Sequence, residues 1–158
     1  MTTELINGDL LDAFDKGEVD VIGHVVNCCG VMGSGIAKSI KKKYPEVFEY
    51  YIDTLSDHEL FYTDPLGEVD FVSIDEHSLT PIVLNIYAQR RYGVDKRHLN
   101  YGALALAFVD IVANTSKDNK IGFPYKMGSD RAGGDWEIVL EMIEFYFKDH
   151  TVKIYKLV

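Results

Sequence analysis

The sequence predicts an α/β fold of three layers, in which helices cover both faces of a mixed, mostly parallel sheet. Short β-branched runs alternate along the chain with longer stretches whose apolar residues recur at helical spacing, which is typical of strand–helix–strand units. A glycine-rich loop joins a strand to a helix twice, towards opposite ends of the chain. A short link between two strands near the middle indicates one antiparallel hairpin, so the sheet is expected to be mixed.

The bulk composition is that of a soluble globular protein. The 158 residues fit one domain, 1–158, and 47% of them are hydrophobic. The formal net charge of −9 argues against a general nucleic-acid binder, which needs a basic face. Neither a cleavable signal nor an apolar run of membrane length is visible, so we expect a cytoplasmic protein with no membrane association. We also expect a monomer.

Cys28 and Cys29 are adjacent and are the only cysteines in the sequence. They provide neither a disulfide framework nor a zinc-type spacing, so reduced thiols are the simplest interpretation. Small cysteines beside a loop are commonly packing residues, although a catalytic thiol stays open as an alternative. We expect neither a metal nor a cofactor.

The chain begins with a predicted strand over 3–7 and a short helix that starts near Leu10. Asp9 is suited to the first turn of this helix, where a carboxylate meets free N–H groups.

The central stretch contains a strand, a glycine-rich turn and a helix in succession. Residues 19–26 are β-branched and mostly apolar, as in a strand buried on both faces, and the helix over 36–44 ends before Pro45. The turn over 30–35 lies at a helix N-terminus, where free N–H groups and the helix dipole favour an anion. Its glycine spacing matches neither the dinucleotide fingerprint nor the P-loop. It is therefore either a phosphate cradle of another kind or a tight turn without a ligand.

The remaining elements follow from the same periodicities. In chain order we expect a helix over 45–55, a polar turn-rich segment over 56–67, strands over 68–75 and 81–89, a helix over 100–115, a strand over 120–124, a second glycine-rich loop over 125–134, a helix over 136–147 and a strand over 151–158. The link after residue 89 is locally basic, which fits either a solvated loop or a rim that faces a phosphate.

Three segments together resemble macro domains, the ADP-ribose-binding fold. The run from His24 to Lys38 is similar to the first ligand loop of that family, and Gly8-Asp9-Leu10 and the segment 85–93 match further family patterns. The resemblance covers nearly the whole chain. It is strongest to the small ADP-ribose 1″-phosphate phosphatases and their phage relatives.

The resemblance implies that the ligand is ADP-ribose or ADP-ribose 1″-phosphate. It places adenine near Asp9 and the Leu10 backbone, although helix capping is the alternative role for Asp9, and it places the distal ribose near Asn27. The diphosphate is expected between two loops, formed by Gly33, Ser34, Gly35 and Ile36 and by Gly128, Ser129, Asp130, Arg131, Ala132 and Gly133.

The resemblance also bears on the reaction. Macro-domain enzymes that remove ADP-ribose from glutamate use a lysine and an aspartate, and the matching positions hold Gln89 and Ala132. An amide cannot form the covalent sugar adduct and alanine cannot transfer a proton, so that reaction is disfavoured. The phosphatase-like members carry a histidine before the loop asparagine and an aspartate before a tryptophan. His24 and Asp135 occupy these positions and, with Asn27, are the candidate catalytic residues.

Each of these assignments has a structural alternative. A histidine can move a proton near neutral pH and a carboxylate can activate water, but His24 fits a core histidine and Asp135 fits a helix cap equally well. Asp130 stands where phosphatase-like members have a glycine beside the diphosphate, and Arg131 could compensate its charge. We therefore predict a phosphatase acting on ADP-ribose 1″-phosphate. The alternatives are a non-catalytic ADP-ribose binding module and a hydrolase of ADP-ribosyl esters on protein or nucleic acid.

Overall fold

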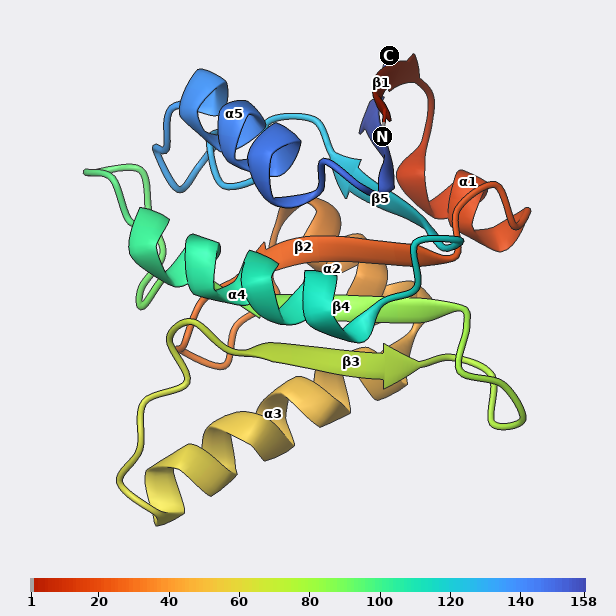
Figure 1. Cartoon of the computed structure of the whole chain (residues 1–158). Coiled ribbons are helices and arrows are strands. Elements are labelled where there is room, and N and C mark those ends of the chain that lie inside the picture. The colour runs from red at the N-terminus through yellow and green to blue at the C-terminus, as the bar shows by residue number, and fades with distance from the viewer. Residues whose placement is uncertain (1) are drawn as a thin grey trace.

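The structure is a computed structural model that describes residues 2–158, and a six-stranded sheet forms its middle layer (Figure 1). The strands are β1 (Thr2–Asn7), β2 (Val21–Val26), β3 (Val69–Ser73), β4 (Ile82–Tyr87), β5 (Lys120–Pro124) and β6 (Thr151–Lys156). The helices are α1 (Leu10–Asp15), α2 (Gly35–Lys43), α3 (Pro45–Leu60), α4 (Tyr101–Asn114) and α5 (Trp136–Tyr146).

The strands are arranged in the order β1-β6-β5-β2-β4-β3. All neighbouring pairs are parallel except β3 and β4, which form the antiparallel hairpin. The prediction of a mixed, mostly parallel sheet is confirmed. Because parallel strands end at the same edge of a sheet, the segments that follow β1, β2, β4, β5 and β6 meet at one edge.

Helices pack on both faces of the sheet, which confirms the three layers (Figure 1). On one face, Phe108 of α4 and Ile143 of α5 pack against Phe123 of β5. On the opposite face, α1, α2 and α3 contribute apolar side chains such as Phe14 and Val47. The β-branched run of β2 is buried between these layers, as its composition predicts.

The structure differs from the sequence-based expectation mainly in α3. This helix continues to Leu60, through part of the segment 56–67 that we expected to be turn-rich. Its last turn is mostly exposed, so it needs no apolar stripe to form. Within residues 2–158, none of the helices combines the length and the apolar character that a membrane crossing requires.

Candidate functional site

A cleft of about 1110 Å³ lies at the edge of the sheet where the parallel strands end. It is lined by Val26 and Asn27 at the end of β2, by Pro124 at the end of β5, and by Tyr155 and Lys156 at the end of β6. Its volume is slightly above the usual range for small-molecule sites. The cleft can therefore hold an extended ligand rather than a single sugar or base.

The first glycine-rich loop forms one wall of this cleft and leads into α2. Gly33, Ser34, Gly35 and Ile36 all line it. Ser34 is the N-cap of α2, but its side chain makes no capping hydrogen bond, so the first N–H groups of this helix are left to an external acceptor. Gly35 has a φ of +58°, and no atom lies within 4 Å of the position that a Cβ would take. The wall is open at the point where an anion is expected.

Asn27 is held in one orientation by its own loop and by Tyr51 of α3. Its Nδ2 donates to the carbonyl of Val31 at 2.8 Å, and its Oδ1 accepts from the N–H of Cys29 at 2.9 Å and from the hydroxyl of Tyr51 at 2.7 Å. An amide has two N–H hydrogens, so one Nδ2 hydrogen has no partner within residues 2–158. Asn27 therefore offers the cleft a donor, which suits a ligand oxygen.

The second glycine-rich loop forms the facing part of the lining. The carbonyl of Ala132 accepts from the N–H groups of His98 and Leu99, at 2.7 and 3.1 Å, which fixes this loop to the basic link after β4. A Cβ at Gly134 would lie 2.4 Å from the side chain of Leu99, so only glycine fits there. The loop residues that line the cleft are Gly128, Asp130, Arg131 and Ala132.

Asp130 causes no backbone strain in the second loop. Among residues 2–158, the non-glycine residues with positive φ are Tyr62 and Lys126. The backbone conformation at Asp130 is thus one that any residue can adopt, so it does not require the glycine that the resemblance to phosphatase-like macro domains leads us to expect there. Arg131 follows Asp130 in the chain and also lines the cleft, so both charges lie at the second loop.

The charge of the lining is opposite in sign to that of the whole chain. The chain has 25 acidic residues against 16 Lys and Arg. Among the described residues that line the cleft, Lys126, Arg131 and Lys156 are basic, and Asp9 and Asp130 are acidic. A local excess of cations beside open helix N–H groups favours an anionic ligand.

His24 and Asp135 do not line this cleft. His24 is fully buried, its Nε2 lies 2.8 Å from Oδ1 of Asn85, and burial lowers its pKa to about 4. Asp135 is exposed and caps α5 by accepting from the N–H of Glu137 at 2.9 Å. A proton-transfer group must reach the reacting atoms, so the geometry of the cleft does not support a catalytic role for either side chain.

Of the other residues expected at the site, most line the cleft and two do not. Ser129 and Gly133 lie in the second loop but outside the lining of the cleft, and Gly133 packs against the backbone of Arg97. The structure brings the following expected residues together around the cleft: Asp9, Leu10, Asn27, Gly33, Ser34, Gly35, Ile36, Gly128, Asp130, Arg131 and Ala132.

Several residues that line the cleft lie at strand ends and were not predicted from the sequence. Tyr125 follows β5 and Lys156 ends β6, and the Lys156 Nζ lies 4.9 Å from the centre of the Tyr125 ring. Tyr92 also lines the cleft from the link after β4. No motif marks these positions, but their place directly at or after the ends of parallel strands could have indicated them.

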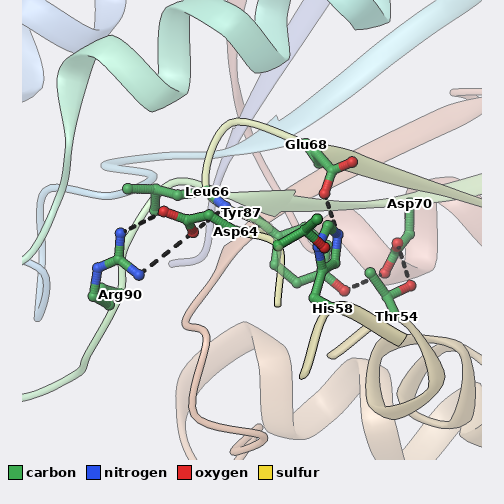
Figure 2. Close-up of polar contacts among 9 residues, drawn as sticks. Thr54, His58, Asp64, Leu66, Glu68, Asp70, Tyr87 and Arg90 are labelled. Carbon is green, nitrogen blue, oxygen red and sulfur yellow. Dashed lines mark hydrogen bonds and ion pairs between the residues drawn. The ribbon is translucent and has the colours of Figure 1, made fainter. Parts of the chain in front are cut away.

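A smaller cavity of about 360 Å³ is lined in part by Cys28, Cys29, His58 and Arg90. Burial raises the pKa of the Cys28 thiol to about 11, so this thiol is protonated and a poor nucleophile at neutral pH. Nearby, Arg90 is paired with Asp64, and His58 with Glu68 (Figure 2). The described residues contain no group of three or more His, Cys, Asp or Glu side chains placed to hold a metal ion.

Comparison with known sequences gives short matches of higher identity and one long match of lower identity. A DNA ADP-ribosyl glycohydrolase of Mycobacterium tuberculosis is 47% identical over 45 residues, which is 28% of this chain and 12% of that protein. An ADP-ribose 1″-phosphate phosphatase of Aspergillus oryzae is 46% identical over 46 residues, 29% of this chain and 21% of that protein. An uncharacterized 17.5 kDa protein of Enterobacteria phage T4 is 26% identical over 150 residues, 92% of this chain and 90% of that protein.

The match to the first of these relatives thus spans only 12% of that protein's length. No family model matches this chain.

Solved structures match over the whole chain. A Bacteroides thetaiotaomicron protein of unknown function has a TM-score of 0.83 and 26% identity, covering 99% of this chain and 98% of that one. The macrodomain of Mycobacterium tuberculosis DarG has a TM-score of 0.78 and 24% identity, covering 98% and 97%. Thermosipho africanus DarTG in complex with ADP-ribose has a TM-score of 0.76 and 21% identity, covering 99% and 42%. The resemblance read from the sequence is therefore confirmed, and this chain has the macrodomain fold.

Proposed function

We propose that this protein binds ADP-ribose, or ADP-ribose 1″-phosphate, in the cleft at the carboxyl ends of the strands. The observation that carries the proposal is that both glycine-rich loops line one cleft, with the uncapped N-terminus of α2 opening into it. Backbone N–H groups at such a terminus bind phosphates without a basic side chain, which fits a chain of net charge −9. The ADP-ribose complex of a protein with this fold supports the same ligand.

The proposed position of the ligand follows from the chemistry along the cleft. The adenine amino group is placed at Asp9, whose Oδ1 already accepts from the N–H groups of Leu11 and Asp12, while its other carboxylate oxygen accepts no hydrogen bond from residues 2–158. The diphosphate is placed between the two glycine-rich loops. The distal ribose is placed at Asn27, whose free Nδ2 hydrogen can donate to a sugar hydroxyl oxygen.

Hydrolysis of ADP-ribose 1″-phosphate is the second candidate function. It is favoured because Gln89 and Ala132 line the cleft, where a glycohydrolase of the lysine–aspartate type would need reactive side chains. The match to the Aspergillus oryzae phosphatase supports the same reaction. Of the carboxylates in the described lining, Asp130 lies on the second loop and Asp9 at the proposed adenine end. In this proposal Asp130 orients a water molecule that attacks phosphorus. The bond between phosphorus and the oxygen on C1″ breaks, that oxygen takes up a proton that the water gives up, and ADP-ribose and inorganic phosphate are released.

Calorimetric titration with ADP-ribose, with ribose 5-phosphate as the control, tests the first proposal. We expect saturable binding of one ADP-ribose per chain and much weaker binding of the control, which lacks adenine. Incubation with ADP-ribose 1″-phosphate, followed by an assay for free phosphate, tests the second. Tight binding without phosphate release would leave a binding module, and no binding of either ligand would refute the proposed function.

A further inference from the structure

We propose that Tyr51 is a positioning residue for the ligand, because its hydroxyl group holds Asn27 and the start of the first glycine-rich loop in their binding shape. Tyr51 lies on α3, is fully buried and is not part of the cleft lining. It therefore acts on the ligand only through the loop. The inference rests on the proposed function, since the shape that Tyr51 maintains matters only if a ligand occupies the cleft.

The Tyr51 hydroxyl group forms hydrogen bonds with three residues, Asn27, Gly30 and Val31. The Tyr51 oxygen accepts from the N–H groups of Gly30 and Val31, at 3.0 and 3.2 Å. Its hydrogen is directed at Asn27, whose backbone oxygen lies 2.8 Å and whose Oδ1 lies 2.7 Å away. Burial raises the pKa of Tyr51, so the hydroxyl keeps this hydrogen at all pH values at which the protein is handled. Both lone pairs and the single hydrogen are thus used on one loop.

The ring of Tyr51 is itself held in place by its packing on Tyr87. It stacks on the ring of Tyr87 with the centroids 5.9 Å apart and an angle of 24° between the planes. Tyr87 donates to one carboxylate oxygen of Asp70 at 2.5 Å, and Thr54 donates to the other at 2.8 Å (Figure 2). A hydroxyl on a ring held in this way has little freedom to follow the loop, so the loop must conform to it.

The opposite side of the loop has a separate attachment that does not replace Tyr51. The carbonyl of Arg90 accepts from the N–H of Cys28 at 3.0 Å and from the Cys29 thiol at 3.3 Å. The guanidinium of Arg90 is paired with Asp64 at 2.7 Å (Figure 2). These contacts secure the two cysteines. The N–H groups of Gly30 and Val31 donate to Tyr51. Tyr51 also holds the Asn27 side chain from α3, in addition to the hydrogen bonds of Asn27 within its own loop.

The variant Tyr51→Phe removes only the hydroxyl and keeps the ring on Tyr87. Tyr44→Phe is the matched control, because the Tyr44 hydroxyl donates to the carboxylate of Asp15 and Tyr44 does not line the cleft. We expect Tyr51→Phe to weaken ADP-ribose binding about tenfold or more, the effect of one lost hydrogen bond on a positioned group. Tyr44→Phe should stay within about twofold of wild type, since it lies away from the ligand.

Amide hydrogen exchange without ligand gives an independent readout of the same loop. The N–H groups of Gly30 and Val31 should exchange faster in Tyr51→Phe than in wild type, and should not change in Tyr44→Phe. Unchanged exchange, or faster exchange with unchanged affinity, or equal loss of affinity in both variants would overturn the inference. If wild type fails to bind ADP-ribose, the proposed function is refuted, and the exchange rates alone then decide whether Tyr51 holds the loop.

Discussion

His24 and Asn85 face each other on neighbouring parallel strands, with Nε2 of His24 2.8 Å from Oδ1 of Asn85. Asn85 uses its Nδ2 to donate to Asp70, so its Oδ1 accepts and Nε2 of His24 carries the hydrogen. Both residues are fully buried. The histidine that the sequence offers as a proton donor at the ribose is therefore a neutral, hydrogen-bonded member of the core.

The buried His24 should make the stability of the fold depend on pH. Its pKa is about 4 in the folded protein against an ordinary value of 6.5, so between these values the unfolded chain binds a proton that the folded chain does not. The free energy of unfolding should fall as the pH drops from 6.5 to 4, by at most about 3 kcal/mol from this group.

Urea denaturation at several pH values, for wild type and His24→Gln, measures this contribution. The glutamine can still donate to Asn85 but does not titrate in this range. We expect a smaller loss of stability between pH 6.5 and 4 in the variant. The same pH dependence in both proteins would show that His24 is protonated in the folded state after all.

The first glycine-rich loop should tolerate no bulky acid at its helix end. Gly35→Glu places a side chain and a negative charge where the diphosphate is proposed to lie, so ADP-ribose binding should be abolished. Gly17→Glu is the matched control, because Gly17 has a φ of +76° with open space around its missing Cβ and lies outside the cleft lining. Both variants should lose about 1–2 kcal/mol of stability from the backbone strain, and only Gly35→Glu should fail to bind in calorimetry.

Asp9 can be tested separately as a helix cap and as an adenine ligand. Asp9→Asn retains a good capping residue but presents an N–H donor in place of one acceptor, whereas Asp9→Ala removes both functions. If Asp9 accepts from the adenine amino group, each change should weaken ADP-ribose binding by about 1.5–3 kcal/mol, with no matching loss for ribose 5-phosphate. Normal ADP-ribose affinity in Asp9→Asn would assign Asp9 to capping alone.

Phosphate release, if it occurs, should depend on Asp130 rather than on Asp135. Asp130 lines the cleft, whereas Asp135 is occupied with capping α5. We expect Asp130→Asn to lower turnover of ADP-ribose 1″-phosphate about a hundredfold or more. Asp135→Asn keeps an asparagine cap and should leave turnover near the wild-type rate. The reverse result would restore the role for Asp135 that the resemblance to the phosphatases implies.

The order of strands and helices along the chain could be predicted from the sequence, because each hydrophobic pattern reflects the burial of the residues that form it. The β-branched run of β2 and the apolar stripe of α5 reflect burial that is visible in the residues themselves. The end of α3 could not be predicted in this way. Its apolar spacing ends at Leu55, and the helix extends five residues further in polar sequence, since its exposed end contacts solvent and needs no apolar face.

The lining of the candidate site could be predicted where it is contiguous in sequence. Gly33 to Ile36 form a recognisable run, and all four residues line the cleft. His24 lies nine residues before Gly33, but it is on a strand, where side chains alternate between faces and only the end of the strand reaches the cleft. Lys156 shows the opposite case, because it carries no motif and reaches the cleft only through the parallel alignment of β6 with its neighbours.

An NMR titration of the isotopically labelled protein with ADP-ribose tests the proposed binding site most directly. We expect saturable shifts of the amide signals of Gly33 to Ile36 and of Gly128 to Ala132, together with Asp9 and Asn27, while the signals of α4 stay in place. The two loops should saturate together, since one diphosphate contacts both. An absence of saturable shifts, or shifts confined to residues outside the cleft, would contradict ADP-ribose binding between the two loops.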